Sequence, residues 1–457
     1  MPKTTADTPF DTIAAIATGQ VLSAIGIVRI SGPDTLRVLD SVFSPLSGTA
    51  MSERPDRKLV LGSLTAQDGQ LLDVCLATVS RGPNSYTGED TAELQCHGSP
   101  TVLQQALLAL FAAGARQAGP GEFTKRAFLN GRMDLTQAEA VIDLIDAQTP
   151  QAAHNAAAQI NGAVTRRTDA IYDDLTAICS HYHAVLDYPD EDIEEFELAD
   201  YSSTLCAAAD SLRALQATFR RGNILKNGVC CAIIGRPNAG KSSLMNALLG
   251  FDRAIVTDIP GTTRDTIEAQ ALVGNVLLRL NDTAGLRDTA DPVERLGVAR
   301  ARSAADEADL VIAVLDGSQP LGDEDEAVLT AAMSAQAHIL LRSKADLASV
   351  WSRDDVIDIS TVTGQGLQEL EHAVAALFPP EKSTVPGEIL TNPRQADAVR
   401  RALEFITAAQ EAMAYGIAPD AVVTEIEGAL AALGELSGRS VNEDITTGIF
   451  ARFCVGK

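Results

Sequence analysis

The sequence predicts a multi-domain protein with an α+β domain at its N-terminus, an α-helical domain made from two discontinuous segments, and an α/β domain inserted between those segments. The chain has 457 residues, enough for about three domains of ordinary size. Its pattern changes from mixed strands and helices to helices alone, and then to alternating strands and helices. Hydrophobic residues make up 46% of the chain, as in folded globular proteins. We expect four stretches, with the boundaries 1–122, 123–227, 228–379 and 380–457.

The first stretch reads as mixed α and β. Ile25–Ile30, Val74–Val79 and Ala92–Cys96 are short apolar runs that suit strands. Val102–Ala113 is an apolar run of helix formers. Together they favour an α+β domain.

The second and fourth stretches read as helices. Between residues 123 and 227, Ala, Leu, Gln, Glu and Asp dominate, and apolar residues recur at helical spacing. Thr136 and Glu139 have the spacing of a capping box that opens a helix. Beyond Pro393, the segments Gln395–Ala414 and Asp420–Leu436 are helical again.

The third stretch alternates strands with helices, which is typical of a doubly wound α/β domain. Because helical segments flank it on both sides, it interrupts a helical domain. Its strand-like runs are Val229–Ile234, Val276–Leu280, Leu310–Leu315, Ile339–Leu341 and Val356–Ile359.

Charge and cysteine content restrict the function. The formal net charge of −25 argues against a broad basic surface that grips nucleic acid. The seven cysteines contain no C-x-x-C pair, which favours a reducing compartment over a disulfide scaffold. The first residues carry no apolar signal core, and no run of about 18 apolar residues occurs, so we expect a cytoplasmic protein with no membrane association.

The strongest motif is Gly235–Ser242, which matches G-x-x-x-x-G-K-[ST] between a strand-like run and a helical run. The backbone N–H groups of such a loop cradle phosphate oxygens. Lys241 would reach the β- and γ-phosphates, and the Ser242 hydroxyl would bind Mg²⁺. The motif predicts a nucleotide site.

Three further motifs predict that the nucleotide is GTP and that the domain is a Ras-like P-loop GTPase. Asp282–Gly285 follows a strand, where a carboxylate holds Mg²⁺ through water. In Gly261–Asp265, Thr263 is the natural second hydroxyl ligand of Mg²⁺. Asp346, in Ser343-Lys344-Ala345-Asp346, can accept both N–H groups of guanine. The expected GTP-binding residues are Asn238, Ala239, Gly240, Lys241, Ser242, Ser243, Thr257, Asp258, Ile259, Pro260, Gly261, Thr262, Thr263, Asp282, Thr283, Ala284, Gly285, Ser343, Lys344, Asp346, Ser360, Thr361 and Val362.

Three positions depart from the usual GTPase pattern. Ser343 replaces the asparagine of Asn-Lys-x-Asp, and because serine is shorter it cannot bridge base and loop in the same way, so we expect lower affinity. Thr361, in Ser360-Thr361-Val362, replaces an alanine, which is tolerable because backbone N–H groups make that contact. Leu286 stands where Ras-like enzymes have a water-positioning glutamine, so another residue must position water, and Glu294 is the candidate.

Over its whole length the chain resembles the MnmE (TrmE) family of tRNA-modifying GTPases. Several independent segments carry the resemblance, which makes it more specific than a P-loop alone. They are Gly26–Gly32, Pro83–Asp90, Gly119–Gly131, Asp134–Ala140 and Phe453–Lys457.

The resemblance implies an N-terminal domain that binds tetrahydrofolate and mediates homodimerisation. It also implies a heterotetramer with an FAD-dependent subunit of the MnmG (GidA) type, which brings FAD and NADH. With that partner, such proteins add an aminomethyl or carboxymethylaminomethyl group to C5 of the wobble uridine of certain tRNAs. The carbon comes from 5,10-methylene-tetrahydrofolate, and 5-formyl-tetrahydrofolate binds at the same domain. GTP hydrolysis requires K⁺ and Mg²⁺.

The resemblance also assigns individual residues. Glu294 falls at the family's water-orienting glutamate, which makes it the expected catalytic residue. Arg132 stands where the family usually has lysine, and Cys454 matches a tail cysteine of undecided role. The K⁺ ligands would be Asn238, Thr257, Ile259 and Thr262, and the folate-binding residues Arg29, Glu93, Arg132 and Lys457.

Other interpretations stay open at this point. His181, His183 and Asp187 could form a metal cluster, although histidines two apart on a helix do not share a face, which favours ordinary helical residues. The chain could be a GTP-dependent ribosome-assembly or RNA-binding switch without modification chemistry. It could also be a folate enzyme that GTP only regulates.

Overall fold

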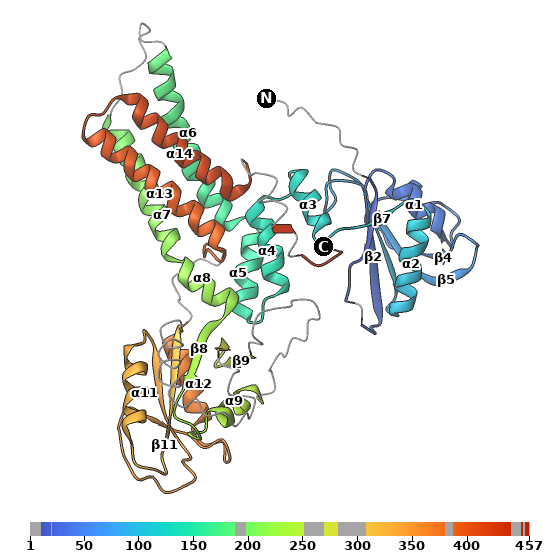
Figure 1. Cartoon of the computed structure of the whole chain (residues 1–457). Helices are drawn as coiled ribbons and strands as arrows, with labels where there is room; N and C mark the ends of the chain where they lie inside the picture. Colours follow the sequence, from blue (N-terminus) through green and yellow to red (C-terminus); the bar gives the residue numbers. More distant parts are fainter. Residues whose placement is uncertain are drawn as a thin grey trace. The chain divides into compact units, whose positions relative to one another are not determined.

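The computed structural model describes residues 11–19, 21–187, 198–250, 269–281, 308–379, 387–439, 449–450 and 453–456 (Figure 1). It divides into two compact units. The first comprises residues 1–142, 159–210 and 398–457, and the second comprises residues 143–158 and 211–397. The expected multi-domain class, with an α+β part, helices from two separated stretches and an α/β part, is confirmed.

A seven-stranded sheet forms the N-terminal part. Its strands lie in the order β3 (Phe43–Pro45), β4 (Val60–Thr65), β5 (Leu71–Ser80), β6 (Thr91–His97), β2 (Ile25–Ser31), β1 (Ile13–Ile16) and β7 (Arg116–Gln117). β1 and β7 pair in parallel, and the other neighbours are antiparallel. The three strands expected from the sequence are therefore confirmed as β2, β5 and β6.

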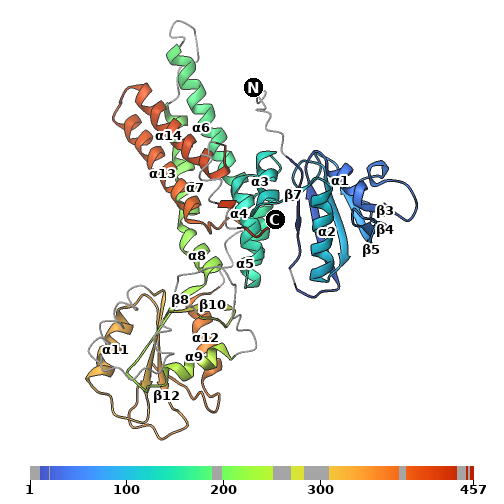
Figure 2. The same ribbon diagram turned by 45° about the vertical axis from the view of Figure 1, so that its right-hand side comes forward.

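The core of this part lies between the sheet and two helices. Helix α2 (Pro100–Ala112) packs across β1, β2, β5 and β6, and both views place it beside the sheet (Figures 1 and 2). Buried side chains alternate along the strands, as in Cys75, Ala77 and Val79 of β5, because successive residues point to opposite faces. The other elements are α1 (Thr35–Val42) and the short 3₁₀ helix η1 (Met51–Glu53).

Helices α3 (Glu122–Leu129), α4 (Leu135–Ile145) and α5 (Pro150–Ile160) follow the sheet. The predicted capping box at Thr136 and Glu139 is wrong by two residues. Asp134 caps α4 instead: its Oδ1 accepts the Gln137 N–H at 2.8 Å, while Gln137 Oε1 accepts the Asp134 N–H at 2.9 Å. Thr136 already lies inside the helix, where its hydroxyl donates to Asp134 at 2.6 Å.

Four longer helices bring together stretches that are far apart in sequence (Figure 1). Arg401 of α13 contacts Glu435 of α14, and His183 of α6 contacts Glu427 of α14. Gln410 of α13 donates to Cys206 of α7 at 3.2 Å. The helices are α6 (Ala163–Asp187), α7 (Leu198–Ala217), α13 (Pro393–Ala414) and α14 (Pro419–Ser437).

The α/β part is doubly wound around a six-stranded sheet. Its strands lie in the order β13 (Ile357–Asp358), β12 (His338–Ser343), β11 (Leu310–Asp316), β8 (Val229–Ile234), β10 (Val276–Asn281) and β9 (Ala269–Val273). All neighbours are parallel except β10 and β9. The five strands expected here from the sequence are confirmed.

Helices cover both faces of this sheet. Leu244 and Leu248 of α9 (Lys241–Leu249) and Leu370 of α12 (Leu367–Leu377) join the core on one face. Val328 and Leu329 of α11 (Asp323–Ser334) join the core on the other. α8 (Phe219–Asn227) leads into β8. Helices cover both faces of the sheet, so a ligand has no access there. In such a fold, ligands bind at the carboxyl ends of the parallel strands.

Candidate functional site

The P-loop turns directly from the carboxyl end of β8 into α9. Asn238 and Gly240 take left-handed backbone angles, with φ of 63° and 102°. A Cβ at Gly235 would lie 2.4 Å from Val314 O, so only glycine fits where the loop passes β11. The sequence therefore folds this segment into a tight turn at the N-terminus of α9, the end of a helix that attracts phosphate.

Lys241 lies across this turn. Its Nζ donates to Gly235 O at 2.8 Å and to Arg236 O at 2.9 Å. Ser242 and Ser243 are exposed in the first turn of α9, and Ala239 is buried behind the loop. The ammonium and the Ser242 hydroxyl thus belong to one turn, as phosphate and Mg²⁺ binding require.

Ser343 joins the end of β12 to the P-loop. Its buried hydroxyl lies 2.6 Å from Ala239 O and 3.1 Å from Leu315 O, and it donates to these carbonyl groups. The Ser343 hydroxyl therefore reaches the loop backbone. That serine cannot bridge base and loop in the way asparagine does, with lower nucleotide affinity as the result, stays a prediction.

Lys344 and Asp346 complete this segment. Lys344 has a φ of 59°, and its Nζ donates to Asp316 Oδ2 at 2.6 Å. Asp346 Oδ1 accepts the Ser360 hydroxyl at 2.7 Å, which fixes the carboxylate expected to read guanine. The Ser360 Oγ in turn accepts the Val362 N–H at 3.3 Å, while the Val362 side chain is exposed. Thr361 lies between them and is partly buried.

Asp316, at the end of β11, is a residue that the motif analysis missed. Burial alone would raise the pKa of Asp316, but hydrogen bonds from Lys344 and Ser318 outweigh it and hold that pKa below its usual value. Arg236 Nη2 of the P-loop lies 3.9 Å from the same carboxylate. Asp316 therefore stays ionised and lies between the P-loop and Ser343–Asp346, the segment expected to recognise the base.

In the N-terminal sheet, Arg29 and Glu93 form a cross-strand pair. They are direct partners in the register of β2 and β6, and Arg29 Nη2 lies 2.8 Å from Glu93 Oε1. The Arg29 guanidinium also lies 5.5 Å from the centre of the Tyr86 ring and 5.8 Å from that of Phe123. Arg29 therefore packs against two aromatic rings, of which Phe123 is buried and Tyr86 is exposed to solvent.

The C-terminal tail reaches the same sheet. Val455 forms a bridge with Pro120, and the Gly121 N–H donates to Cys454 O at 3.3 Å. Gly456 passes so close to β1 that a Cβ there would lie 2.3 Å from Ile16 O. Cys454 itself is exposed. The described tail residues Cys454–Gly456 are therefore docked on the N-terminal part of the chain.

Arg132 is exposed, and its stem lies beside Gly88, where a Cβ on the glycine would be 3.3 Å from Arg132 Cγ. Gly88 belongs to the same loop as Tyr86. Arg132 thus borders the loop that carries one of the aromatic rings, and it comes from the segment after α3.

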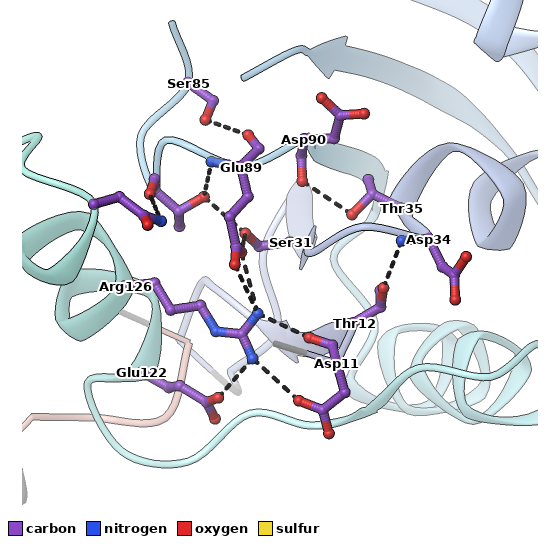
Figure 3. Close-up of polar contacts among 12 residues, drawn as sticks. Asp11, Thr12, Ser31, Asp34, Thr35, Ser85, Glu89, Asp90, Glu122 and Arg126 are labelled. Carbon is purple, nitrogen blue, oxygen red and sulfur yellow. Dashed lines mark hydrogen bonds and ion pairs between the residues drawn. The ribbon is translucent and has the colours of Figure 1, made fainter. Parts of the chain in front are cut away.

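A buried ionic network, which the sequence did not predict, links α3 to Asp11 and to Glu89 in the loop before β6 (Figure 3). Arg126 of α3 is 1% exposed, and its Nη1 donates to Glu89 Oε2 at 3.1 Å and to Asp11 O at 2.8 Å. Its Nη2 donates to Glu122 Oε1 at 2.9 Å. Ser31 of β2 donates to Glu89 at 2.7 Å. The only local signal was the opposite charge of Glu122 and Arg126, four residues apart.

The remaining predicted site residues lie outside the described residues. They belong to the expected switch segments, to the catalytic position and to the last residue of the chain. They are Thr257, Asp258, Ile259, Pro260, Gly261, Thr262, Thr263, Asp282, Thr283, Ala284, Gly285, Glu294 and Lys457.

Comparison with known proteins covers almost the whole chain. The family model for the MnmE helical domain matches residues 135–454, and that for the GTP-binding protein TrmE N-terminus matches residues 12–132. The tRNA modification GTPase MnmE of Roseiflexus sp. (strain RS-1) is 43% identical, with coverage of 98% of this chain and 99% of that protein. The chain belongs to the MnmE family. The MnmE of Symbiobacterium thermophilum is 41% identical, over the same share of both chains.

Among solved structures, the G domain of the T. maritima FeoB iron transporter matches part of this MnmE-family chain. The match covers 33% of this chain and 98% of that one, with 28% sequence identity and a TM-score of 0.25. In the part of the MnmE-family chain that the structure describes, every helix is too short or too polar to cross a membrane.

Proposed function

We propose that the chain is a K⁺-dependent GTP hydrolase that modifies C5 of the wobble uridine of certain tRNAs. It adds an aminomethyl or carboxymethylaminomethyl group, acting with an FAD-dependent partner and a tetrahydrofolate one-carbon donor. Membership of the MnmE family makes it a GTP hydrolase that acts in tRNA modification. The observation that carries the nucleotide part is the Ser343 hydroxyl, which ties the base-recognition segment to the P-loop at Ala239.

The residues present fit GTP with Mg²⁺. Lys241 supplies a cation within the phosphate-binding turn, and Asp346 is already oriented by Ser360. Ser242, with Thr263, would hold Mg²⁺ through hydroxyl oxygens, the ligand type that this hard cation prefers. Bound Mg²⁺ would neutralise charge on the phosphates. The other GTP contacts, Gly261, Asp258, Pro260 and Asp282–Gly285, belong to the same proposal.

The K⁺ site would use the exposed Asn238 side chain on its left-handed turn. Asn238, Thr257, Ile259 and Thr262 together supply amide, hydroxyl or carbonyl oxygens, and oxygen donors are what an alkali cation needs. A cation fixed there offsets charge that grows between the phosphates, and Glu294 would orient the attacking water.

The folate site would lie at Arg29 and Glu93. Both short contacts of Arg29 use Glu93 Oε1, which leaves Oε2 for the N–H edge of a pterin. Arg29, Arg132 and Lys457 would supply cations for the glutamate carboxylates, and the bridge between Val455 and Pro120 supports a tail that contributes to this site. Cys454, whose backbone carbonyl accepts the Gly121 N–H, belongs to the same proposal as a functional cysteine.

We further propose the assemblies that the chemistry requires. The chain forms a homodimer, and with an MnmG (GidA)-type subunit it forms a heterotetramer. The partner supplies FAD and NADH for the redox step, as the family resemblance implies. We place the reaction in the cytoplasm, where tRNA and GTP occur together.

A comparison of monovalent salts tests the K⁺ part of the proposal. The GTP hydrolysis rate of the full chain should be much higher in KCl than in NaCl at equal ionic strength, by about tenfold or more if the cation replaces an arginine finger in part. Asn238→Ala should lower the KCl rate to the NaCl rate while GDP binding persists. Equal rates of the parent chain in both salts would refute the K⁺ role.

A further inference from the structure

Helices α6 and α14 place three metal-binding side chains together, outside the sites described above. Cys179 and His183 are four residues apart on α6, so they lie on the same face of that helix. Glu427 comes from α14, which packs along α6 (Figure 1). The set joins residues more than 240 positions apart in sequence, as the separation of His183 and Glu427 shows.

The distances suit one metal ion. His183 Nε2 lies 3.1 Å from Glu427 Oε1, and one ligand atom from each of the three residues lies within 4.8 Å of the other two. Bonds of about 2.0–2.3 Å to zinc separate neighbouring ligand atoms of a tetrahedron by roughly 3.3–3.8 Å. Small side-chain rotations therefore bring all three atoms to bonding distance, without movement of the helices.

The surroundings also suit a cation. The His183 and Glu427 side chains are 50% and 54% exposed, so an ion has access from solvent, while Cys179 is buried beneath them.

We propose that Cys179, His183 and Glu427 form a binding site for a divalent transition metal of the Zn²⁺ class, which clips α6 to α14. One thiolate, one imidazole and one carboxylate are ligands that zinc accepts, and water fills the fourth position. This set of ligands differs from the cluster of His181, His183 and Asp187 that was considered from the sequence. His181 Nδ1 instead hydrogen bonds to the Tyr201 hydroxyl of α7.

A second cluster, Asp73, Cys75 and Cys96, is a weaker candidate. Cys75 and Cys96 are 4% and 1% exposed and belong to the apolar core between the N-terminal sheet and its helices. An ion there would have to enter a packed interior, whereas the site on α6 and α14 opens to solvent. The second cluster therefore serves as an internal comparison in the test.

Cobalt substitution tests the proposal on the full chain. Metal-free protein should bind one Co²⁺ with a sulfur-to-cobalt charge-transfer band, and added Zn²⁺ should displace it. Cys179→Ser should remove the band. His183→Gln and Glu427→Gln, both at half-exposed positions, should keep the fold and weaken Co²⁺ binding by about tenfold or more.

Matched controls identify the site. Glu425→Gln removes a carboxylate from the same helix α14, and Cys206→Ser removes an exposed thiol from α7; both should leave Co²⁺ affinity and the band unchanged. Three outcomes would overturn the proposal. They are the absence of a charge-transfer band, a band that persists unaltered in His183→Gln and Glu427→Gln, and a band that disappears only in Cys96→Ser.

Discussion

At the scale of single residues, Ser343 stands where a side chain is expected to contact both the P-loop and the base, and its hydroxyl supplies the contact to the P-loop. The hydroxyl reaches Ala239 O and Leu315 O, so the link between the base-recognition segment and the P-loop survives the change from asparagine. A serine hydroxyl has one proton, and because it donates that proton to these carbonyl groups it has no further hydrogen-bond donor for the base. In the proposed site, affinity for guanine would then rest on Asp346, which Ser360 holds in place.

Ser343→Asn should therefore tighten the binding of both GDP and GTP, and by the same factor, because the base is common to the two nucleotides. One additional net hydrogen bond contributes about 1 kcal/mol, which is roughly a fivefold change in Kd. Isothermal titration of the full chain measures it. Ser334→Asn, at the exposed end of α11, is the control and should change neither Kd. Unchanged Kd values in Ser343→Asn would mean that Ser343 does not limit the affinity for GDP or GTP.

Motif residues were predictable because a short stretch of chain contains all that they need. Lys241 and Gly240 follow from the spacing of the P-loop alone. Asp316 and Arg126 were not predictable, since their roles depend on contacts between distant segments. Arg126 reaches Asp11, 115 positions away, and Lys344 reaches Asp316, 28 positions away. Such pairings are set by packing, which periodicity does not encode.

At the scale of elements, the position of α3 depends on a carboxylate that stays ionised. Glu122 begins α3 and contacts both Arg116 and Arg126. Burial alone would raise its pKa, but hydrogen bonds from Arg116, the Gly119 N–H and Arg126 lower the pKa of Glu122 to about 2. Its side chain is only 18% exposed, so solvent screens these contacts weakly.

The stability of this region should therefore fall in acid. Because the folded pKa lies below the unfolded value of 4.5, Glu122 stabilises the fold above pH 4.5 and loses that effect as the pH falls towards 2. The full contribution is about 3 kcal/mol. Hydrogen exchange of peptides from β1 and α3, in urea, measures it.

Glu122→Gln should remove most of this pH dependence and lower stability at pH 7. Glu53→Gln, at an exposed position in η1, should leave the pH profile as in the parent chain. The same slope in Glu122→Gln as in the parent chain would show that Glu122 does not hold α3.

The C-terminal tail is a second element with a specific requirement. Gly456 has a φ of 104° and passes β1 at Ile16, so a methyl group would strike a backbone carbonyl. Gly456→Ala should undock the tail and weaken 5-formyl-tetrahydrofolate binding by about tenfold, because the tail carries Lys457, a residue of the proposed folate site. The GTPase rate should not change.

Gly416→Ala is the matched control for this prediction. Gly416 also has a left-handed φ, of 64°, but no atom lies within 4 Å of an added Cβ. Gly416→Ala therefore also places an L side chain at a positive φ, but without the clash, and folate affinity should stay at the parent value. Equal folate affinity in Gly456→Ala and in the parent chain would show that the docked tail does not contribute to folate binding.

The bounds expected for strands and helices lie within a few residues of the observed ones, although β1, β3, β4, β7 and β9 were not expected. The misplaced start of α4 is instructive. β8 begins and ends where the apolar run Val229–Ile234 does, because a buried parallel strand is a continuous apolar segment. The start of α4 was misjudged because two overlapping pairs have capping-box spacing. Asp134 and Gln137 form the cap, and the Thr136 hydroxyl is engaged with Asp134 and Thr165.

At the scale of the whole molecule, one long insertion separates helices that pack together. α6 and α7 precede the α/β part, and α13 and α14 follow it. The contact between His183 and Glu427 spans that insertion. Periodicity predicted both sets of helices, but only the packing of their side chains shows which faces meet.

The net charge of −25 also belongs to this scale. It describes the sum over the chain, while contact with tRNA needs only a local basic patch. We expect the FAD-dependent partner to hold most of the tRNA phosphates. The acidic chain would then contribute GTP hydrolysis and the one-carbon site rather than a broad nucleic-acid surface.

The most direct test of the central claim is the nucleoside composition of tRNA from cells that lack this chain. Mass spectrometry should show wobble uridine without its C5 aminomethyl-type group. The parent gene should restore the modification, and Lys241→Ala should not, because it removes the phosphate-binding cation. Unchanged wobble uridine after deletion, or full restoration by Lys241→Ala, would contradict the account.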